Sequence, residues 1–388
     1  MKSYKHLFSR AFAAAPERAH FAAHSHHLWP DASYEGHMQA WQDAAIHADR
    51  KWDRIFGEVM PQAQANIARE LNLPDAATIA FAPNTHELLM RLFSARRPGP
   101  IEVLTSDGEF HSFRRQAARW EETGWVNQRI VPCEPFESFT DRFLAAAREK
   151  QPDIVFLSHV MFKSGLRFDG VEELARQASP DGMWVALDLY HSFMAIPCDF
   201  GAVAERVFLL GGGYKYAMAG EGAGFIHAPP GYGMRPSFTG WFADFVAIEA
   251  KQQGVAYAKD GGRFLGATYD STGLYRFNAV QEMLARERLD TAQISARVAR
   301  LQAPLIEAIA AGEAGPLKQA QLLAPNPAGP NARFVSLRHP SATEWKAKLM
   351  ANNIITDARD DVLRIGLGLY HDAADVAAFC ARAKQALG

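Results

Sequence analysis

The chain has 388 residues, 48% of them hydrophobic and 22% charged, so it can bury a large core and form a large domain with a smaller companion. Its 41 basic and 43 acidic residues leave a net charge of -2, which gives no electrostatic reason to expect nucleic acid or an anionic membrane as partner. Three widely spaced cysteines form no CxxC pair, and we find neither an apolar run near membrane-helix length nor the apolar core of a signal peptide. We therefore expect a soluble, cytoplasmic protein.

Strands and helices are predicted to alternate through the first two thirds of the chain. A short extended segment at 21–30 precedes helical periodicity from about Tyr34 to Leu71. Strands are then predicted at 77–83, 101–108, 153–160, 184–190 and 207–213, with helices at 84–95, 111–123, 137–150 and 171–179. This alternation predicts an α/β fold with a mainly parallel sheet and helices on both faces. Ligands bind such sheets at the carboxyl ends of the strands.

The pattern changes after about residue 255. A Gly-rich crossing segment leads into a long helix predicted from about Gln281 to Ala311, and a Pro- and Gly-rich loop at 323–332 precedes a strand at 333–339. A helix, a strand at 362–370 and a final amphipathic helix follow. We predict a large domain at 35–255 and a smaller α+β domain formed by 1–34 and 256–388.

Asp188 and Lys215 form the central pair of candidate functional residues. Asp188 ends one apolar strand, and Lys215 follows the next strand and three glycines that permit a sharp turn and close backbone approach. Taken singly, Asp188 could be a helix cap or loop residue and Lys215 a surface residue. Together they suit pyridoxal phosphate, whose ring nitrogen pairs with a carboxylate and whose aldehyde forms an imine with a lysine.

Two further segments could complete a cofactor site. Asn84, Thr85 and His86 open a helix after a strand, where free backbone N–H groups and the helix dipole favour a phosphate. Ordinary N-capping by Asn84 or Thr85 explains the same residues and is compatible with phosphate binding. Phe110 could stack on a planar ring, or it could belong to the core, as most phenylalanines do.

Arg364 interrupts an apolar strand, and its guanidinium fork suits a substrate α-carboxylate. An internal salt bridge with Asp357 or Asp360 is an equally good explanation, because a buried arginine needs a partner. The histidines of the 24–27 segment lack a matching cluster of Cys, Asp or Glu ligands, so we expect no metal and assign them to a wall of the active site.

Seven short elements in a fixed order resemble those of kynureninase and its relatives in the class V aminotransferase group, which have the type I pyridoxal phosphate fold of aspartate aminotransferase. They are EFHS (109–112), SHVMFKSG (158–165), DLYH (188–191), YKY (214–216), GWF (240–242), GATY (266–269) and LRIGLGLYHDAADV (363–376). The resemblance extends from about residue 20 to the C-terminus.

The resemblance implies roles for particular residues. Lys215 forms the imine, Asp188 pairs with the ring nitrogen, Phe110 stacks on the ring, and Arg364 holds the substrate carboxylate. Further cofactor contacts are implied for Ser112, Ser158, His191, Tyr214 and Trp241. Thr268 would reach the phosphate of the neighbouring subunit, which implies a homodimer with shared active sites.

The substrate end departs from the kynureninase pattern. Phe113 replaces a polar cofactor contact, and Met161 and Phe162 replace an Asn-Tyr pair. His24, Ser25, His26 and His27 stand where the family has Asn-Ser-Leu-Gly, and they would face the substrate. These differences put kynurenine itself in doubt as the substrate.

We therefore expect a pyridoxal phosphate enzyme that forms an imine with an amino acid and deprotonates its Cα with Lys215. The outcome would be kynureninase-like hydrolysis or transamination, with β-elimination or cysteine desulfuration as the alternative. A desulfurase needs a nucleophilic cysteine on a mobile loop near Arg364, whereas Cys380 lies in the predicted terminal helix. A non-enzymatic relative of this fold would have lost Lys215 or Asp188, and both are present.

Overall fold

The structure, a computed structural model, describes residues 2–96, 99–247, 254–323 and 332–388, and for 245–247 it describes the backbone alone. Most of the loop predicted at 323–332 lies outside these ranges. Within them, every helix is either too short or too polar to cross a membrane.

A seven-stranded sheet forms the centre of the larger part of the molecule. Across the sheet the order is β2 (Ile79–Ala82), β8 (Gly224–His227), β7 (Val207–Gly211), β6 (Trp184–Asp188), β5 (Ile154–Ser158), β3 (Ile101–Ser106) and β4 (Val126–Val131). Six strands are parallel, and β8 runs antiparallel to both of its neighbours. The α/β fold with a mainly parallel sheet is therefore confirmed.

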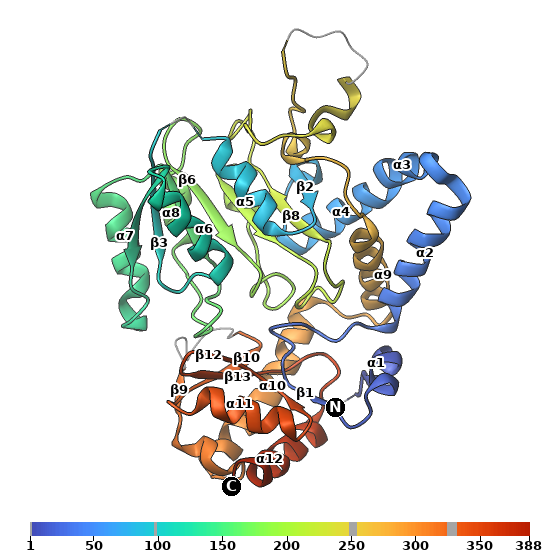
Figure 1. Cartoon of the computed structure of the whole chain (residues 1–388), viewed down its shortest axis with the longest axis vertical. Coiled ribbons are helices and arrows are strands. Elements are labelled where there is room, and N and C mark those ends of the chain that lie inside the picture. The colour runs from blue at the N-terminus through green and yellow to red at the C-terminus, as the bar shows by residue number, and fades with distance from the viewer. Residues whose placement is uncertain (1, 97–98, 248–253, 324–331) are drawn as a thin grey trace.

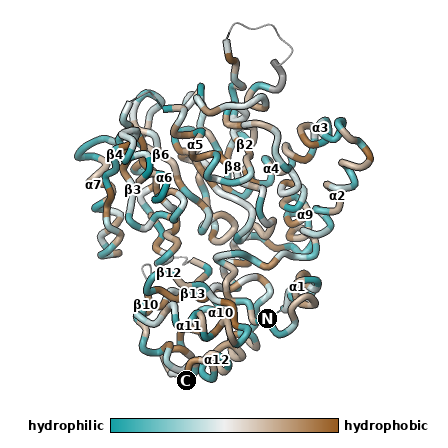
Figure 2. The backbone as a smooth tube through the Cα atoms, in the orientation of Figure 1, coloured by the Kyte–Doolittle hydropathy of each residue, from teal (hydrophilic) through white to brown (hydrophobic). Residues whose placement is uncertain are grey.

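Helices connect and cover these strands (Figure 1). They are α5 (Thr85–Ser94), α6 (His111–Glu122), α7 (Phe139–Glu149) and α8 (Val171–Gln177). The long N-terminal periodic segment is α2 (Asp31–His47), α3 (Lys51–Arg54), a π-helical turn at Ile55–Val59 and α4 (Met60–Leu71), with an interruption at Ala48, where φ is 49°. Hydrophobic and hydrophilic residues alternate along these helices (Figure 2), and α4 to α8 each bury apolar residues in one large core.

Two strands of the large sheet were not predicted. β4 lies at the sheet edge, and its middle residues Asn127, Gln128 and Arg129 are polar and partly exposed, so it has no continuous apolar run. β8 is short and follows a Gly-rich stretch. The single long helix expected from Gln281 to Ala311 was wrong, because α9 (Thr272–Arg286) ends before α10 (Thr291–Ala310) starts as a new helix, whose N-cap Asp290 forms a capping box with Gln293.

A second, antiparallel sheet forms the C-terminal part, with its own apolar core. Its order is β12 (Asp357–Arg359), β13 (Val362–Gly366), β10 (Phe334–Arg338) and β9 (Gln321–Leu323). It is accompanied by α10, α11 (Ala342–Ala351) and α12 (Ala373–Leu387), while β1 (Ala19–His20) pairs with β11 (Ile354–Ile355), and α1 (Ser9–Ala14) lies near the N-terminus (Figure 1).

The domain boundaries at 34/35 and 255/256 stay a prediction. Helix α9 belongs by sequence to the C-terminal part, yet it packs on helices α2 and α4 of the N-terminal part. The Asn66 side-chain amide donates to Asn278 Oδ1 at 3.1 Å, and the backbone of Tyr275 approaches Gly36 closely.

Candidate active site

The carboxyl ends of the central strands border a cavity of about 240 Å³. Strand register brings Ser158 of β5 opposite Asp188 of β6, and Asp188 opposite Leu210 of β7. The cavity is lined by Asn84, Thr85, His86, Leu89, Phe110, Ser112, Phe113, Phe156, Ser158, Val160, Phe162, Asp188, Tyr190, His191, Leu210, Tyr214 and Lys215. The sequence-predicted cofactor residues therefore meet in one place, except Trp241 and Thr268.

Lys215 lies in the β7–β8 connection and is only 5% exposed. Its Nζ is 3.2 Å from His191 Nε2 and lies 5.3, 4.8 and 5.3 Å from the ring centroids of Phe110, Tyr190 and Tyr214. Burial lowers the pKa of Lys215 to about 7, although the Asp188 charge opposes this shift. A large fraction of Lys215 is therefore a neutral amine at neutral pH.

Asp188 ends β6 and is oriented by the backbone, because its Oδ1 accepts a hydrogen bond from Tyr190 N at 2.8 Å. Burial raises the pKa of Asp188, while the Tyr190 N–H and the Lys215 charge favour its ionised form. The second carboxylate oxygen is left for a cationic group in the cavity.

The turn into α5 both caps the helix and faces the cavity. The Asn84 side chain accepts from Glu87 N at 3.1 Å, so the predicted N-cap is found. That bond satisfies one of the N–H groups that open a helix and leaves those of Thr85 and His86 for a ligand. Phosphate binding and capping are thus compatible here.

One wall of the cavity is aromatic. Phe110 lines the cavity rather than the closed core, and its ring meets the Phe162 ring edge-on at 5.4 Å. Phe113, the residue that replaces a polar family contact, is buried and stacks on Phe156 with centroids 4.0 Å apart and an interplanar angle of 11°. This wall offers dispersion contacts and few hydrogen bonds.

The three glycines before Lys215 allow close packing, as predicted. A Cβ at Gly212 would lie 2.2 Å from the Tyr190 hydroxyl oxygen, and one at Gly213 would lie 2.7 Å from the carbonyl oxygen of Gly220. Any larger residue would therefore displace the Lys215 segment.

Arg364 is 2% exposed and does not line the cavity. Its guanidinium donates to Asp357 and to the carbonyl oxygen of Phe162, and Arg359 also donates to Asp357 at 2.8 Å. The salt bridge with Asp357, one of the two alternatives for Arg364, is therefore present, whereas Asp360 pairs with Lys163 at 3.0 Å. The two arginines leave this buried cluster with a net positive charge.

The 24–27 segment lies beside the cavity. His24 is fully buried with Nε2 3.8 Å from Asp357 Oδ2, and burial lowers its pKa to about 3. His26 is exposed and stacks on Tyr214 at 5.1 Å, while Ser25 is partly exposed. In the described ranges, no three His, Cys, Asp or Glu side chains are grouped to hold a metal ion.

Trp241 and Thr268 contact each other, with the indole N–H donating to Thr268 Oγ1 at 3.1 Å. Neither residue lines the cavity of its own chain, and Trp241 is 48% exposed. Their roles in cofactor binding, in this subunit or the next, stay predictions.

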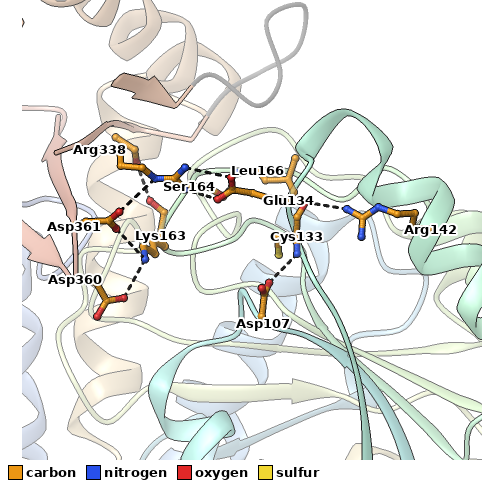
Figure 3. A network of polar contacts seen from close by, with 11 residues as sticks. Asp107, Cys133, Glu134, Arg142, Lys163, Ser164, Leu166, Arg338, Asp360 and Asp361 are labelled. Carbon is orange, nitrogen blue, oxygen red and sulfur yellow. Dashed lines mark hydrogen bonds and ion pairs between the residues drawn. The ribbon is translucent and has the colours of Figure 1, made fainter. Parts of the chain in front are cut away.

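A polar network crosses from the large sheet to the small one beside the cavity (Figure 3). Lys163, directly after Phe162, pairs with Asp360 and, at 3.3 Å, with Asp361 in the β12–β13 turn. Arg338 at the end of β10 pairs with Glu134 after β4 and lies 3.6 Å from Asp361. These pairs join the loops after β4 and β5 to the small sheet.

Residues 37–379 match the aminotransferase class-V family. The chain belongs to this family. It is also 30% identical over 183 residues to isopenicillin N epimerase of Streptomyces clavuligerus, a match that spans 44% of this chain and 43% of the epimerase. Solved structures with a similar fold include the cystine C-S lyase C-DES (TM-score 0.80, 17% identity, 99% of each chain) and a cysteine desulfurase of Thermococcus onnurineus (0.78, 16%, 99% and 98%).

Class V membership makes this chain a pyridoxal phosphate-dependent enzyme. The cavity fits that cofactor: it offers an amine at Lys215, a carboxylate at Asp188, the N-terminus of α5 for a phosphate and the face of Phe110 for a ring. His191 Nδ1, in addition, is buried without a hydrogen-bond partner in the structure.

Sequence reasoning missed three residues of this class V site. Tyr190 lines the cavity, and its position two residues after Asp188 in DLYH was the available signal. Glu109 lies under the cavity within the EFHS element. Arg359 donates to Asp357, which also pairs with Arg364. This shared contact follows from the pairing of β12 with β13, which the sequence did not indicate.

Proposed function

We propose that this enzyme is an aminotransferase that acts on an amino acid, with Lys215 removing the Cα proton and returning a proton at the cofactor. The observation that carries the proposal is a buried amine, with its pKa lowered to about 7, in one cavity with the Asp188 carboxylate. Transamination needs only one base that serves two carbons, and the groups close to the Lys215 amine are His191 and the rings of Phe110, Tyr190 and Tyr214.

Bound pyridoxal phosphate supplies an aldehyde that condenses with amines and a ring that withdraws electrons from the attached carbon. In this proposal Asp188 keeps the ring nitrogen protonated, and the N–H groups at Thr85 and His86 hold the phosphate. Phe110 covers one ring face, and Asn84, Ser112, Ser158, His191 and Tyr214 complete the contacts. The Nε2 atom of His191, whose pKa burial lowers well below its ordinary value, lies 3.2 Å from Lys215 Nζ, within hydrogen-bond distance.

Arg364 is proposed to bind the substrate α-carboxylate. Its pairing with Asp357 holds the guanidinium behind Phe162, and the second arginine leaves positive charge for a substrate anion. Such a clamp would orient the Cα–H bond toward Lys215. His24, Ser25 and His26 would border the substrate side chain.

Epimerisation is a second candidate, supported by the similarity to isopenicillin N epimerase. It uses the same Cα deprotonation and needs no second substrate. Kynureninase-like hydrolysis would demand a further group that activates water, and the Phe113 and Phe162 wall supplies none.

β-Elimination needs no cysteine nucleophile, so it remains an outcome to test. Cysteine desulfuration is less well supported, because none of the three cysteines lines the cavity. Burial raises the pKa of the Cys198 thiol to about 12 and that of Cys133 higher still, so neither is a ready nucleophile.

We also propose a homodimer with shared active sites. The support is that Thr268 and Trp241, expected at a cofactor site, do not line the cavity of their own chain, and Trp241 is exposed, where a neighbouring subunit could use it.

The deciding experiment incubates the holoenzyme in D₂O with a panel of amino acids, with and without a 2-oxo acid. Deuterium at Cα, together with a new amino acid formed only with the oxo acid, supports the aminotransferase. Exchange with loss of stereochemistry supports the epimerase, anthranilate plus alanine from kynurenine supports the hydrolase, and pyruvate from cysteine or cystine supports the lyase. Absence of Cα exchange with every amino acid would overturn the shared mechanism.

A further inference from the structure

Glu109 is a buried acid beneath the cofactor cavity that has no basic partner. It is 0% exposed, and in the described part of the chain no Lys, Arg or His forms an ion pair with it. It follows the carboxyl end of β3 and precedes Phe110, so its side chain acts at the turn that carries the aromatic wall.

The carboxyl group of Glu109 joins two strand ends. Its Oε2 accepts from both Ser158 N at 2.8 Å and Ser158 Oγ at 2.6 Å, and its Oε1 lies 2.5 Å from Ser106 Oγ. Ser106 ends β3 and Ser158 ends β5, and these strands are neighbours in the sheet. Glu109 therefore ties the turn before Phe110 to the strand end that lines the cavity.

These contacts suit a protonated carboxyl. With the proton on Oε1, Glu109 donates to Ser106, which in turn is free to donate to Met161 Sδ at 3.8 Å. Every proton then has an acceptor, and no unpaired charge is buried. Asp188 on β6 is a titratable group whose charge acts on Glu109, and Asp107 and Glu109 both act on the neighbouring Cys133 thiol.

The surroundings favour the same state electrostatically. Burial raises the pKa of Glu109 to about 8, and the Asp188 charge raises it further against the hydrogen bonds from Ser106 and Ser158. A neutral Glu109 leaves Asp188 as the one carboxylate available to a cationic ring nitrogen.

We propose that Glu109 is a positioning residue which, as a neutral acid, joins Ser106 to Ser158 and so holds the Phe110 turn and the Ser158 hydroxyl against bound pyridoxal phosphate without touching it. This inference rests on the proposed cofactor contacts of Phe110 and Ser158. Because Ser158 commits its hydroxyl proton to Glu109, its oxygen faces the cavity only as a hydrogen-bond acceptor.

The test compares Glu109→Gln and Glu109→Ala with the wild type for pyridoxal phosphate affinity and for circular dichroism in the visible band of the bound cofactor. Glutamine has the same shape, can accept from Ser158 and can donate to Ser106, so it should recover most of the affinity. Alanine leaves both serines without their partner and should weaken cofactor binding about tenfold or more and reduce the dichroic band.

Asp153→Ala is the matched control. Asp153 is a buried acid at the amino end of β5, where it accepts from Arg96 at 2.9 Å and from Glu102 N at 3.0 Å, away from the cavity. It should lower thermal stability but leave cofactor affinity and dichroism within about twofold of the wild type.

If Glu109→Ala lowers only the melting temperature, as Asp153→Ala does, the positioning role is wrong. A Glu109→Gln variant as impaired as Glu109→Ala would overturn the neutral state, and this comparison stands even if the alanine variant does not fold. Failure of the proposed aminotransferase function would look different, because the wild type would then bind pyridoxal phosphate but form no new amino acid with a 2-oxo acid.

Discussion

The cofactor side of the cavity and the proposed substrate side beside it are built differently. On the cofactor side, the sheet register brings Ser158 and Asp188 together at the strand ends, and the connection after β7 adds Lys215. On the proposed substrate side, Arg364, Arg359, Asp357 and His24 do not line the cavity; they come from the small sheet and the N-terminal segment and are already engaged with one another. Backbone pairing positions the cofactor side, whereas side-chain ion pairs position the proposed substrate side. Substitutions on the proposed substrate side should therefore disturb the fold less.

Removing the amine should have the largest effect. Lys215→Ala should abolish the visible absorbance of bound cofactor and reduce turnover on the order of 10³-fold or more, because the condensing amine and the base are both lost. Lys163→Ala is the control, since Lys163 is a half-buried partner of Asp360 outside the cavity and should keep the band. Normal absorbance in Lys215→Ala would refute the role of this lysine.

On the substrate side, Arg364→Ala should cost about 3 kcal/mol of unfolding free energy, because it breaks a buried ion pair. If Arg364 binds the α-carboxylate, this variant should also raise KM for an amino acid far more than for the corresponding amine that lacks the carboxylate. Arg359→Ala, which removes the other partner of Asp357, should affect stability with little such discrimination. Equal KM changes for both substrates would leave Arg364 a purely structural residue.

The cofactor side should also show a characteristic pH dependence. Only the neutral amine of Lys215 condenses with an aldehyde, and its pKa is lowered from 10.5 to about 7. The rate at which the apoenzyme acquires the visible cofactor band should therefore rise as pH increases through about 7 and level off above it. A rate that keeps rising toward pH 10.5 would show that Lys215 behaves as a solvent-exposed lysine.

The network in Figure 3 should give the smallest effect. Glu134→Gln removes the partner of Arg338 in a half-exposed pair and should lower the unfolding free energy by about 0.5 kcal/mol, less at high salt. Glu122→Gln, which breaks a pair with Arg119 inside α6, is the matched control and should leave KM unchanged. A change in KM for Glu134→Gln alone would connect the network to the substrate side.

The comparison of the two sides also explains what could be predicted from the sequence. Asp188 and Lys215 were predictable because each follows an apolar run that reads as a strand. A polar residue at or just after the carboxyl end of such a strand lies where ligands bind. Arg364 left two alternatives open, because its partner depends on which strand pairs with β13, and no local pattern encodes that pairing. Glu109 escaped notice because an acid in a loop looks exposed until both serines are seen to surround it.

Local patterns failed elsewhere for similar reasons. β4 is an edge strand with polar middle residues, so its identity depends on β3 beside it. The break between α9 and α10 had a readable signal, the Asp290 and Gln293 capping box, which the continuous apolar periodicity obscured. Trp241 and Thr268 could be matched to the family by sequence, but neither lines the cavity of its own chain, so their role in a site stays a prediction.

The antiparallel strand β8 restricts how Lys215 can move. The chain leaves β7 at Gly211 and returns at Gly224, and Phe225 pairs directly with Gly211, so both ends of the segment that carries Lys215 are anchored in one sheet. Within this segment, Gly212 packs closely against the Tyr190 side chain, and Gly213 packs closely against the backbone of Gly220. The backbone on both sides of Lys215 is thus anchored. In the proposed mechanism, the Lys215 amine would therefore move between the two carbons by rotation about its own side-chain bonds.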